Sequence, residues 1–319
     1  MEENFSKDKK TLVVIAGPTA CGKTASSVLL AKKIGGEIIS ADSMQVYKYM
    51  DIGTAKITED EKEGVPHYLI DEFMPDNEFN IKIFQQRANE YIEKIYNNGH
   101  IPILVGGTGF YINSVVYNNN FMETNSDNSI RKKFEEEAEK YGAEYLYEKL
   151  KNIDFEYAQN IHYNNVKRVI RAIEFYMQTG CKLSEHNKNE HLKESPYNTA
   201  FFVLNMDRQK LYERINLRVD IMLKNGLENE VKNLLDLGYS PNLVSMQGLG
   251  YKEMIPYIKG EIPLEQAVEE IKKGTRHFAK RQLTWFKHQA KGIWIDTTDK
   301  DYVYTADKMY EYLKVNRLI

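Results

Sequence analysis

Cysteine is scarce in this sequence: Cys21 and Cys181 are the only two among 319 residues. Two cysteines are too few for a disulfide framework or a four-ligand zinc site, and the histidines show no metal-ligand spacing. No run is long and apolar enough to span a bilayer, and the polar start of the chain lacks the apolar core of a signal peptide. These absences predict a cytoplasmic globular protein without zinc and without a membrane segment.

A strong charge of either sign is also missing. The formal net charge is −3, which by itself does not indicate a nucleic-acid-binding protein. The distribution is uneven, however, because residues 123–161 are rich in glutamate, whereas residues 271–292 contain many lysines and arginines and no acidic residue. A local basic surface can bind phosphates whatever the charge of the whole chain.

The order of hydrophobic patterns predicts the fold class. Short apolar runs alternate with segments of helical periodicity at both ends of the chain, which is typical of a parallel sheet covered by helices. The runs predicted as strands are residues 11–16, 37–41, 101–105, 201–206 and 292–296. Residues 129–179 show only helical periodicity, and residues 184–195 are polar enough to predict a mobile loop. We therefore predict an α/β core from residues 1–118 and 200–319, with an inserted helical subdomain at residues 119–199.

A phosphate-binding loop follows the first predicted strand and opens a helix. Its residues fit the pattern G-x-x-x-x-G-K-[ST] and are Gly17, Pro18, Thr19, Ala20, Cys21, Gly22, Lys23 and Thr24. The glycines let backbone amides surround an anion, the lysine neutralises the terminal phosphate, and the threonine hydroxyl can hold Mg²⁺. The motif indicates a polyphosphate ligand without identifying it, and whether ATP binds there stays open. We interpret Cys21 as a small filler of the loop.

The expected metal-supporting aspartate of a nucleotide hydrolase is missing. The third predicted strand ends in Gly106-Gly107, whereas the second ends at Asp42. Because the carboxyl ends of neighbouring parallel strands share one crevice, Asp42 should face the phosphate loop. A carboxylate beside a diphosphate is a poor phosphate ligand but a plausible base for an incoming nucleophile. The alternative is that Asp42 caps the next turn or holds a metal through water.

Several further motifs occur in order along the chain. They are ADSMQVYKYMDIGTAK at 41–56, VPHYLID at 65–71, VGGTGFY at 105–111, KRVIRAIE at 167–174, QGLGYKE at 247–253 and AKRQLTWFK at 279–287. Together with the phosphate loop they resemble the bacterial tRNA dimethylallyltransferase family over nearly the whole sequence. The resemblance implies transfer of dimethylallyl from its diphosphate to the N6 amine of the adenosine 3′ of the anticodon in tRNA. It also implies Mg²⁺ at the diphosphate, and we expect a monomer.

The resemblance assigns roles to particular residues. It implies Asp42 as the base, Thr19 as a second catalytic group, and Arg218 rather than Arg214 as the arginine that closes on the diphosphate. Surface salt bridges with Glu213 or Asp220 are the alternative for both arginines. The residues implied to contact the tRNA anticodon stem-loop are Asp42, Ser43, Met44, Gln45, Thr108, Arg131, Lys167, Arg168, Val169, Ile170, Arg171, Gln247, Gly248, Gly250, Tyr251, Lys280 and Arg281.

Two of these RNA-contact segments have a purely structural alternative. The aromatic residues Phe278 and Phe286 are interpreted as the core stripe of a helix whose basic residues alone are exposed. Gly248 and Gly250 either permit close approach of RNA to the backbone or only shape a turn.

Three other functions remain to be separated from tRNA prenylation. A small-molecule kinase also combines a phosphate loop with an aspartate on the second strand, but is usually shorter, with a compact arginine-rich lid. An enzyme that prenylates free adenine nucleotides would not need the segments implied to contact RNA. A non-enzymatic nucleotide switch is disfavoured by Asp42 and by the lack of a suitably placed N-K-x-D motif. Incubation of the protein with labelled dimethylallyl diphosphate and bulk tRNA distinguishes all three in one assay.

Overall fold

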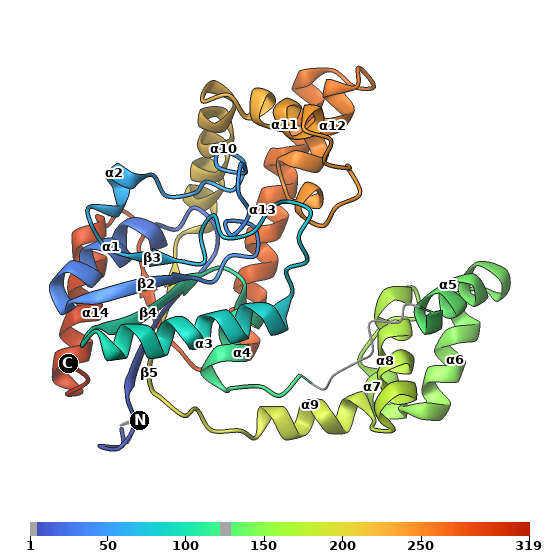
Figure 1. Cartoon of the computed structure of the whole chain (residues 1–319), viewed down its shortest axis with the longest axis horizontal. Helices are drawn as coiled ribbons and strands as arrows, with labels where there is room; N and C mark the ends of the chain where they lie inside the picture. The colour runs from blue at the N-terminus through green and yellow to red at the C-terminus, as the bar shows by residue number, and fades with distance from the viewer. Residues whose placement is uncertain (1–4, 122–128) are drawn as a thin grey trace. The chain divides into compact units, whose positions relative to one another are not determined.

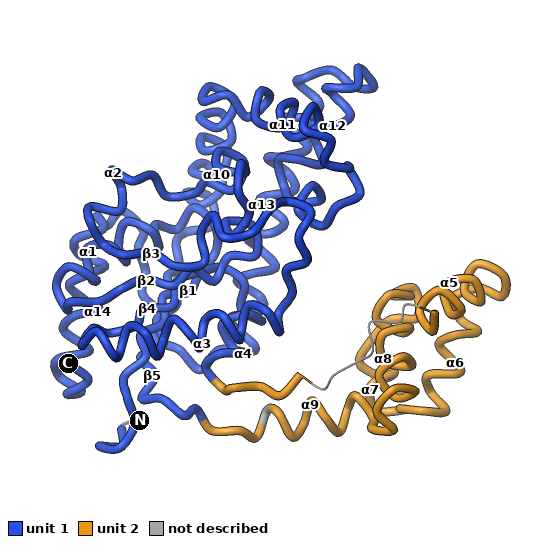
Figure 2. The backbone as a smooth tube through the Cα atoms, in the orientation of Figure 1, with its two compact units in different colours: residues 1–116, 195–319 blue, residues 117–194 orange. Residues whose placement is uncertain are grey.

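The computed structural model describes residues 5–121 and 129–319. The chain divides into two compact units (Figure 2), unit 1 with residues 1–116 and 195–319 and unit 2 with residues 117–194. The predicted insert, residues 119–199, overlaps unit 2, and its last residues fall in the strand that begins at Asn198. Within the described residues, no helix has the length and hydropathy that crossing a membrane requires.

Unit 1 is built on a six-stranded sheet, in which every described pair of neighbouring strands is parallel. The strand order is β3-β2-β4-β1-β5-β6. The strands are β1 (Thr11–Ala16), β2 (Gly36–Ser40), β3 (His67–Tyr68), β4 (Ile101–Gly106), β5 (Asn198–Asn205) and β6 (Ile293–Asp296). The predicted fold class, a parallel sheet core flanked by helices, is confirmed. Strand β3 lies outside the predicted strands, because two residues are too few to show a pattern.

Helices cover both faces of the sheet (Figure 1). Val13 and Ile15 share a core with α1 (Lys23–Ile34) and α14 (Tyr302–Val315). Because side chains alternate along a strand, the buried Leu12 and Val14 point to the opposite face. Helices α3 (Ile81–Asn97) and α4 (Gly109–Val116) pack there against β4. Burial on both faces explains why the strands read as continuous apolar runs.

The remaining helices of unit 1 lie in the second half of the chain, apart from the short α2 (Glu59–Lys62). They pack one against the next in chain order. They are α10 (Arg208–Lys224), α11 (Leu227–Asp236), the 3-10 turn η1 (Ser245–Gln247), α12 (Tyr251–Ile258) and α13 (Leu264–Gln289). Helix α13 also contacts α4 and thereby reaches the end of β4, which places it beside the site described below.

Unit 2 is helical throughout its described elements and has its own apolar core, which includes Phe134 and Leu146. Its helices are α5 (Ser129–Tyr141), α6 (Ala143–Ile153), α7 (Phe155–Gln159), α8 (Val166–Thr179) and α9 (Leu183–His191). The loop predicted at residues 184–195 is wrong over most of its length, because α9 occupies it. The buried Asp154 accepts a hydrogen bond from the backbone N–H of Ser184 at 2.9 Å, a tertiary anchor that polarity alone does not reveal.

Candidate active site

The phosphate loop between β1 and α1 is shaped by two glycines. Gly17 has φ 148° and Gly22 has φ 96°, both in the region that side chains disfavour. A Cβ on Gly17 would lie 2.5 Å from the carbonyl oxygen of Leu204, and one on Gly22 would lie 2.9 Å from the ring of Tyr302. The loop therefore runs close to β5 and α14 and ends at the N-terminus of α1, where amides are available to an anion.

The lysine of this loop folds back onto it. Lys23 Nζ donates to the carbonyl oxygens of Gly17 and Pro18 at 3.0 and 2.7 Å, and burial lowers the pKa of its ammonium group. The side chain of Thr24 is exposed on the first turn of α1. Cys21 is buried and lies against Gly17, which agrees with its interpretation as a filler.

Asp42 lies two residues beyond the end of β2 and faces this loop. Its Oδ1 accepts the backbone N–H of Met44 at 2.9 Å, and burial raises the pKa of its carboxyl group. The end of β4 beneath it has no room for an aspartate, because a Cβ on Gly106 would overlap the carbonyl of Ala41. The glycines that replace the usual strand-end carboxylate thus permit the close approach of β4 to the chain that carries Asp42.

Two arginines of α10 reach the same region. Arg214 Nη2 donates to the hydroxyl of Tyr302 at 2.9 Å, and burial lowers the pKa of the Arg218 guanidinium. The salt-bridge alternative is not seen among the described residues. Asp220 pairs instead with Lys272 at 2.7 Å, and Glu213 accepts a hydrogen bond from Gln209.

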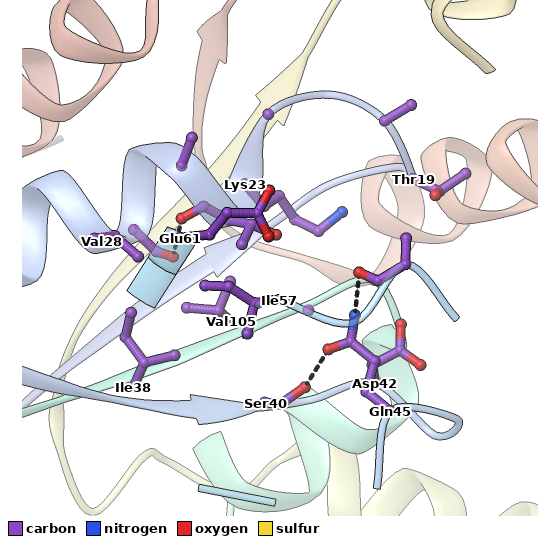
Figure 3. Close-up of a pocket in the computed structure, with 18 of the residues that line it drawn as sticks. Thr19, Lys23, Val28, Ile38, Ser40, Asp42, Gln45, Ile57, Glu61 and Val105 are labelled. Atoms are coloured by element: carbon purple, nitrogen blue, oxygen red, sulfur yellow. Dashed lines mark hydrogen bonds between the residues drawn. The ribbon is translucent and has the colours of Figure 1, made fainter. Parts of the chain in front are cut away.

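These groups line one cavity of about 420 Å³ within unit 1. Figure 3 shows Thr19 and Lys23 along one side of the cavity, with Ser40, Asp42 and Gln45 along the other. Several residues that the sequence predicts for the site line this cavity: Thr19, Ala20, Gly22, Lys23, Thr24, Asp42, Gln45 and Arg218. Arg214, the alternative clamp, lines the cavity as well.

The cavity also contains residues without a functional role predicted from the sequence, although one of them, Gln282, lies within the AKRQLTWFK motif. These are Phe278 and Gln282 of α13 and Tyr302 of α14. The interpretation of Phe278 as a core residue is wrong, since its half-buried ring lines the cavity, whereas Phe286 is fully buried as expected. Helix α13 lies more than two hundred residues beyond the loop, so only the fold could reveal this proximity.

The donor set of the cavity suits Mg²⁺ bound mainly through a ligand. Mg²⁺ takes oxygen ligands and usually retains waters and phosphate oxygens, with only one or two protein groups. The exposed hydroxyl of Thr24 at the start of α1 provides such a group. Among the described residues, no cluster of three or more His, Cys, Asp or Glu side chains could hold a metal without help from a ligand.

The segment after Asp42 is held by its own hydrogen bonds. Gln45 accepts from the Ser40 hydroxyl at 3.1 Å and donates to the carbonyls of Thr54 and Ala55. The Gln45 amide is therefore engaged within the protein, whereas Ser43, Met44 and Thr108 are partly exposed.

The Gln247–Tyr251 segment packs against the segment that follows Asp42. A Cβ on Gly248 would lie 2.5 Å from Met44 Cε, and Gly250 has φ 96° at the start of α12. The ring of Tyr251 is fully buried, so this side chain is not available to RNA. Gln247 is exposed, whereas Gly248 packs closely and Gly250 forms a turn, and contact of this segment with RNA stays a prediction.

The basic run of α13 separates into two groups. Lys272 pairs with Asp220, and Arg276 donates to Asn216 at 2.6 Å, so these two join α13 to α10. Lys280 and Arg281 are exposed and line a shallow cavity of about 460 Å³ together with His277, Thr284 and Trp285.

Two of the predicted RNA contacts of unit 2 share one carboxylate. Arg131 and Arg171 both contact the buried Glu174, at 2.9 and 3.4 Å, which holds two exposed guanidinium groups near each other. Lys167 and Arg168 are exposed on the first turn of α8. The side chains of Val169 and Ile170 are buried in the core of unit 2, and this removes them from the set of side chains that can touch RNA.

A family described as IPP transferase matches residues 45–289, more than half of the chain. The chain belongs to the IPP transferase family. Two curated relatives named tRNA dimethylallyltransferase come from Lachnoclostridium phytofermentans and Acetivibrio thermocellus. They are 55% and 51% identical, and each alignment covers 95% of this chain and 96% of the relative.

Solved structures of IPP transferases have the same fold. The tRNA isopentenylpyrophosphate transferase of Bacillus halodurans is 44% identical with a TM-score of 0.74, and the match covers 97% of both chains. A eukaryotic dimethylallyltransferase, described as acting on tRNA, is 32% identical with a TM-score of 0.80. That match covers 96% of this chain and 78% of the other. The family resemblance drawn from the motifs is thereby confirmed.

Proposed function

We propose that this chain is a tRNA dimethylallyltransferase that transfers dimethylallyl from its diphosphate to the N6 amine of the adenosine 3′ of the anticodon. One observation within the chain itself supports the proposal most directly. Asp42, a carboxylate whose pKa is raised by burial, shares a cavity with a phosphate loop and two arginines. This combines a proton acceptor with an anion site, as alkylation of an amine by a diphosphate requires.

In the proposed reaction the C1–O bond of the donor breaks, and the diphosphate leaves with the electron pair. Lys23, the loop amides and Arg218 bind the developing charge, while Thr19 orients the donor. The N6 lone pair forms the new C–N bond, and the N6 proton passes to the carboxylate of Asp42. Mg²⁺ held by Thr24 and the diphosphate would neutralise further charge on the leaving group.

Each unit contributes its own set of proposed RNA contacts. In unit 1 the set comprises the segment from Asp42 to Gln45, Thr108, Gln247, Lys280 and Arg281. In unit 2 it comprises Arg131, Lys167, Arg168 and Arg171. An anticodon loop presents unpaired bases, so its adenine can be flipped into a protein pocket. Exposed cations supply the contacts to phosphates, which position the RNA without reading its sequence.

The experiment is transfer of label from dimethylallyl diphosphate into bulk tRNA, followed by nucleoside analysis of the product. Parallel reactions replace tRNA with adenosine monophosphate or replace the donor with ATP. The proposal expects N6-prenylated adenosine from tRNA alone. Equal use of adenosine monophosphate would indicate an enzyme of free nucleotides. Turnover of ATP without RNA, in the absence of prenyl transfer, would indicate a kinase or hydrolase.

A further inference from the structure

Gln282 joins three parts of unit 1 through a single side-chain amide. It lies on α13 and is only 6% exposed. Its Oε1 accepts the backbone N–H of Thr19 in the phosphate loop at 2.9 Å. Its Nε2 donates to the carbonyl oxygen of Gly107 at 3.0 Å. Both ends of the amide are thus engaged, one with the donor site and the other with the end of β4.

The end of β4 is shaped to receive this side chain. A Cβ on Gly107 would overlap Gln282 Nε2, so any other residue at this position would displace the amide. The neighbouring Gly109 is likewise covered by the ring of Trp285, one helical turn further along α13. Two contacts from α13 therefore lie on either side of Thr108.

The exposed side of the same helical turn carries positive charge. Lys280 and Arg281 directly precede Gln282 in sequence and point to a different side of α13. One turn of helix thereby presents cations to the outside and an amide to the phosphate loop. A ligand that contacts Lys280 and Arg281 therefore binds the same turn that orients Thr19.

We infer that Gln282 is a positioning residue of the transfer reaction, which acts through Thr19. Its amide fixes the backbone of Thr19, and this directs the Thr19 side chain into the cavity. It also holds Gly107 and thus the adjacent Thr108 in register with the loop. This inference rests on the proposed function for the reaction that is measured, but it makes a separate claim about one residue.

The test replaces Gln282 by methionine, which has similar length and lacks both hydrogen bonds. The matched control is Gln266→Met, because Gln266 is exposed on the same helix and its amide donates to the exposed Glu270. The readouts are the single-turnover rate at saturating donor and tRNA, the KM of the donor and the melting temperature. A displacement of about 1 Å at a reacting group can cost about 100-fold, so we expect a rate loss of about 10- to 100-fold.

A double-mutant cycle separates positioning from general destabilisation. If Gln282 acts through Thr19, Gln282→Met should cost much less in a Thr19→Val background, because residues that act as a unit are not additive. The same full loss in both backgrounds would overturn the inference. So would a normal single-turnover rate in Gln282→Met at a temperature where the variant is folded.

Gln282→Glu provides a second variant in case the methionine variant does not fold. A protonated carboxyl group can accept from Thr19 and donate to Gly107, whereas a carboxylate cannot donate. The rate relative to the wild-type protein should therefore rise as pH falls. The charged and titratable groups that line the cavity in both proteins are Lys23, Asp42, Glu61, Glu63, His67, Arg214, Arg218 and Tyr302. The ratio removes the titration that the two proteins share. A ratio independent of pH would contradict the inference, whereas an inactive wild-type protein would instead contradict the proposed function.

Discussion

Glu230 anchors the loop that follows Asp42, and its removal should be costly. One carboxylate on α11 accepts three consecutive backbone N–H groups, those of Asp51, Ile52 and Gly53, at 2.8, 2.7 and 3.0 Å. It also accepts the hydroxyl of Tyr251 at 2.6 Å. The amide of Asp51 is exposed and can return to water, whereas the other three donors are partly buried and lose this acceptor in Glu230→Ala.

The expected loss follows from those three donors. Each orphaned donor costs at least about 1 kcal/mol, so Glu230→Ala should lower the free energy of unfolding by about 3 kcal/mol. Tyr251→Phe removes one of the bonds and should cost about 1 kcal/mol. Urea denaturation followed by circular dichroism measures both, with the exposed Glu269→Ala as the control. A loss below about 1 kcal/mol for Glu230→Ala would refute this role, because exposed substitutions alone change stability by about 0.5 kcal/mol.

Four further predictions concern the reaction and the binding of tRNA. Asp42→Asn keeps the acceptor for Met44 but removes the base, so turnover should fall by about 10² to 10⁴ while tRNA affinity stays within a few-fold. Activity needs the deprotonated carboxylate of Asp42, and burial raises the pKa of this group. The wild-type rate should therefore be lost as pH falls through a value above the usual aspartate range. Lys23→Ala should impair use of the donor and Thr24→Ala should weaken the dependence on Mg²⁺, both measured by steady-state kinetics. Neutralising Lys280 and Arg281 should reduce the salt dependence of tRNA binding by about one unit of slope for each phosphate interaction removed, with donor binding unchanged.

The predictions for these variants each have a contradicting result. Near-normal turnover in Asp42→Asn would make Asp42 a structural residue. Unchanged donor kinetics and metal dependence in both loop variants would place the donor elsewhere. An intact salt slope after neutralisation would exclude the outer face of α13 from the RNA surface. The control for Asp42→Asn is Asp60→Asn. Asp60 is exposed on α2 and does not line the cavity, so this substitution removes a carboxylate away from the site.

Local patterns are sufficient to predict the elements near the phosphate loop. The strand at residues 11–16 and the helix after Gly22 follow directly from apolar runs and glycine positions, because these signals act over a few neighbouring residues. The position of Asp42 beside the loop follows as well, since parallel strands bring their carboxyl ends to one edge. Helix α9 does not follow from its own polar sequence, because it is held by Asp154, which lies thirty residues earlier.

The partners of the site cannot be predicted in the same way. Phe278 and Gln282 have the side chains of an ordinary amphipathic helix, and only the packing of α13 against the end of β4 directs them into the cavity. The same limit applies to Tyr251, which the motif places among the RNA contacts. Its burial depends on Gly53, where a Cβ would lie 2.5 Å from the ring, a relation between two distant segments.

The paired glycines at the end of β4 connect these observations to the chemistry. In nucleotide hydrolases this position usually carries an aspartate that supports the metal. Here Ala41 and the amide of Gln282 occupy the space that such a side chain would need. The nearest carboxylate past a strand end is Asp42, two residues beyond β2, and burial raises its pKa. A higher pKa makes the carboxylate a better proton acceptor, so in the proposed mechanism the phosphate loop faces a base rather than a second metal ligand. This arrangement favours attack by a weakly basic amine on the carbon of a diphosphate ester over attack by water on phosphorus.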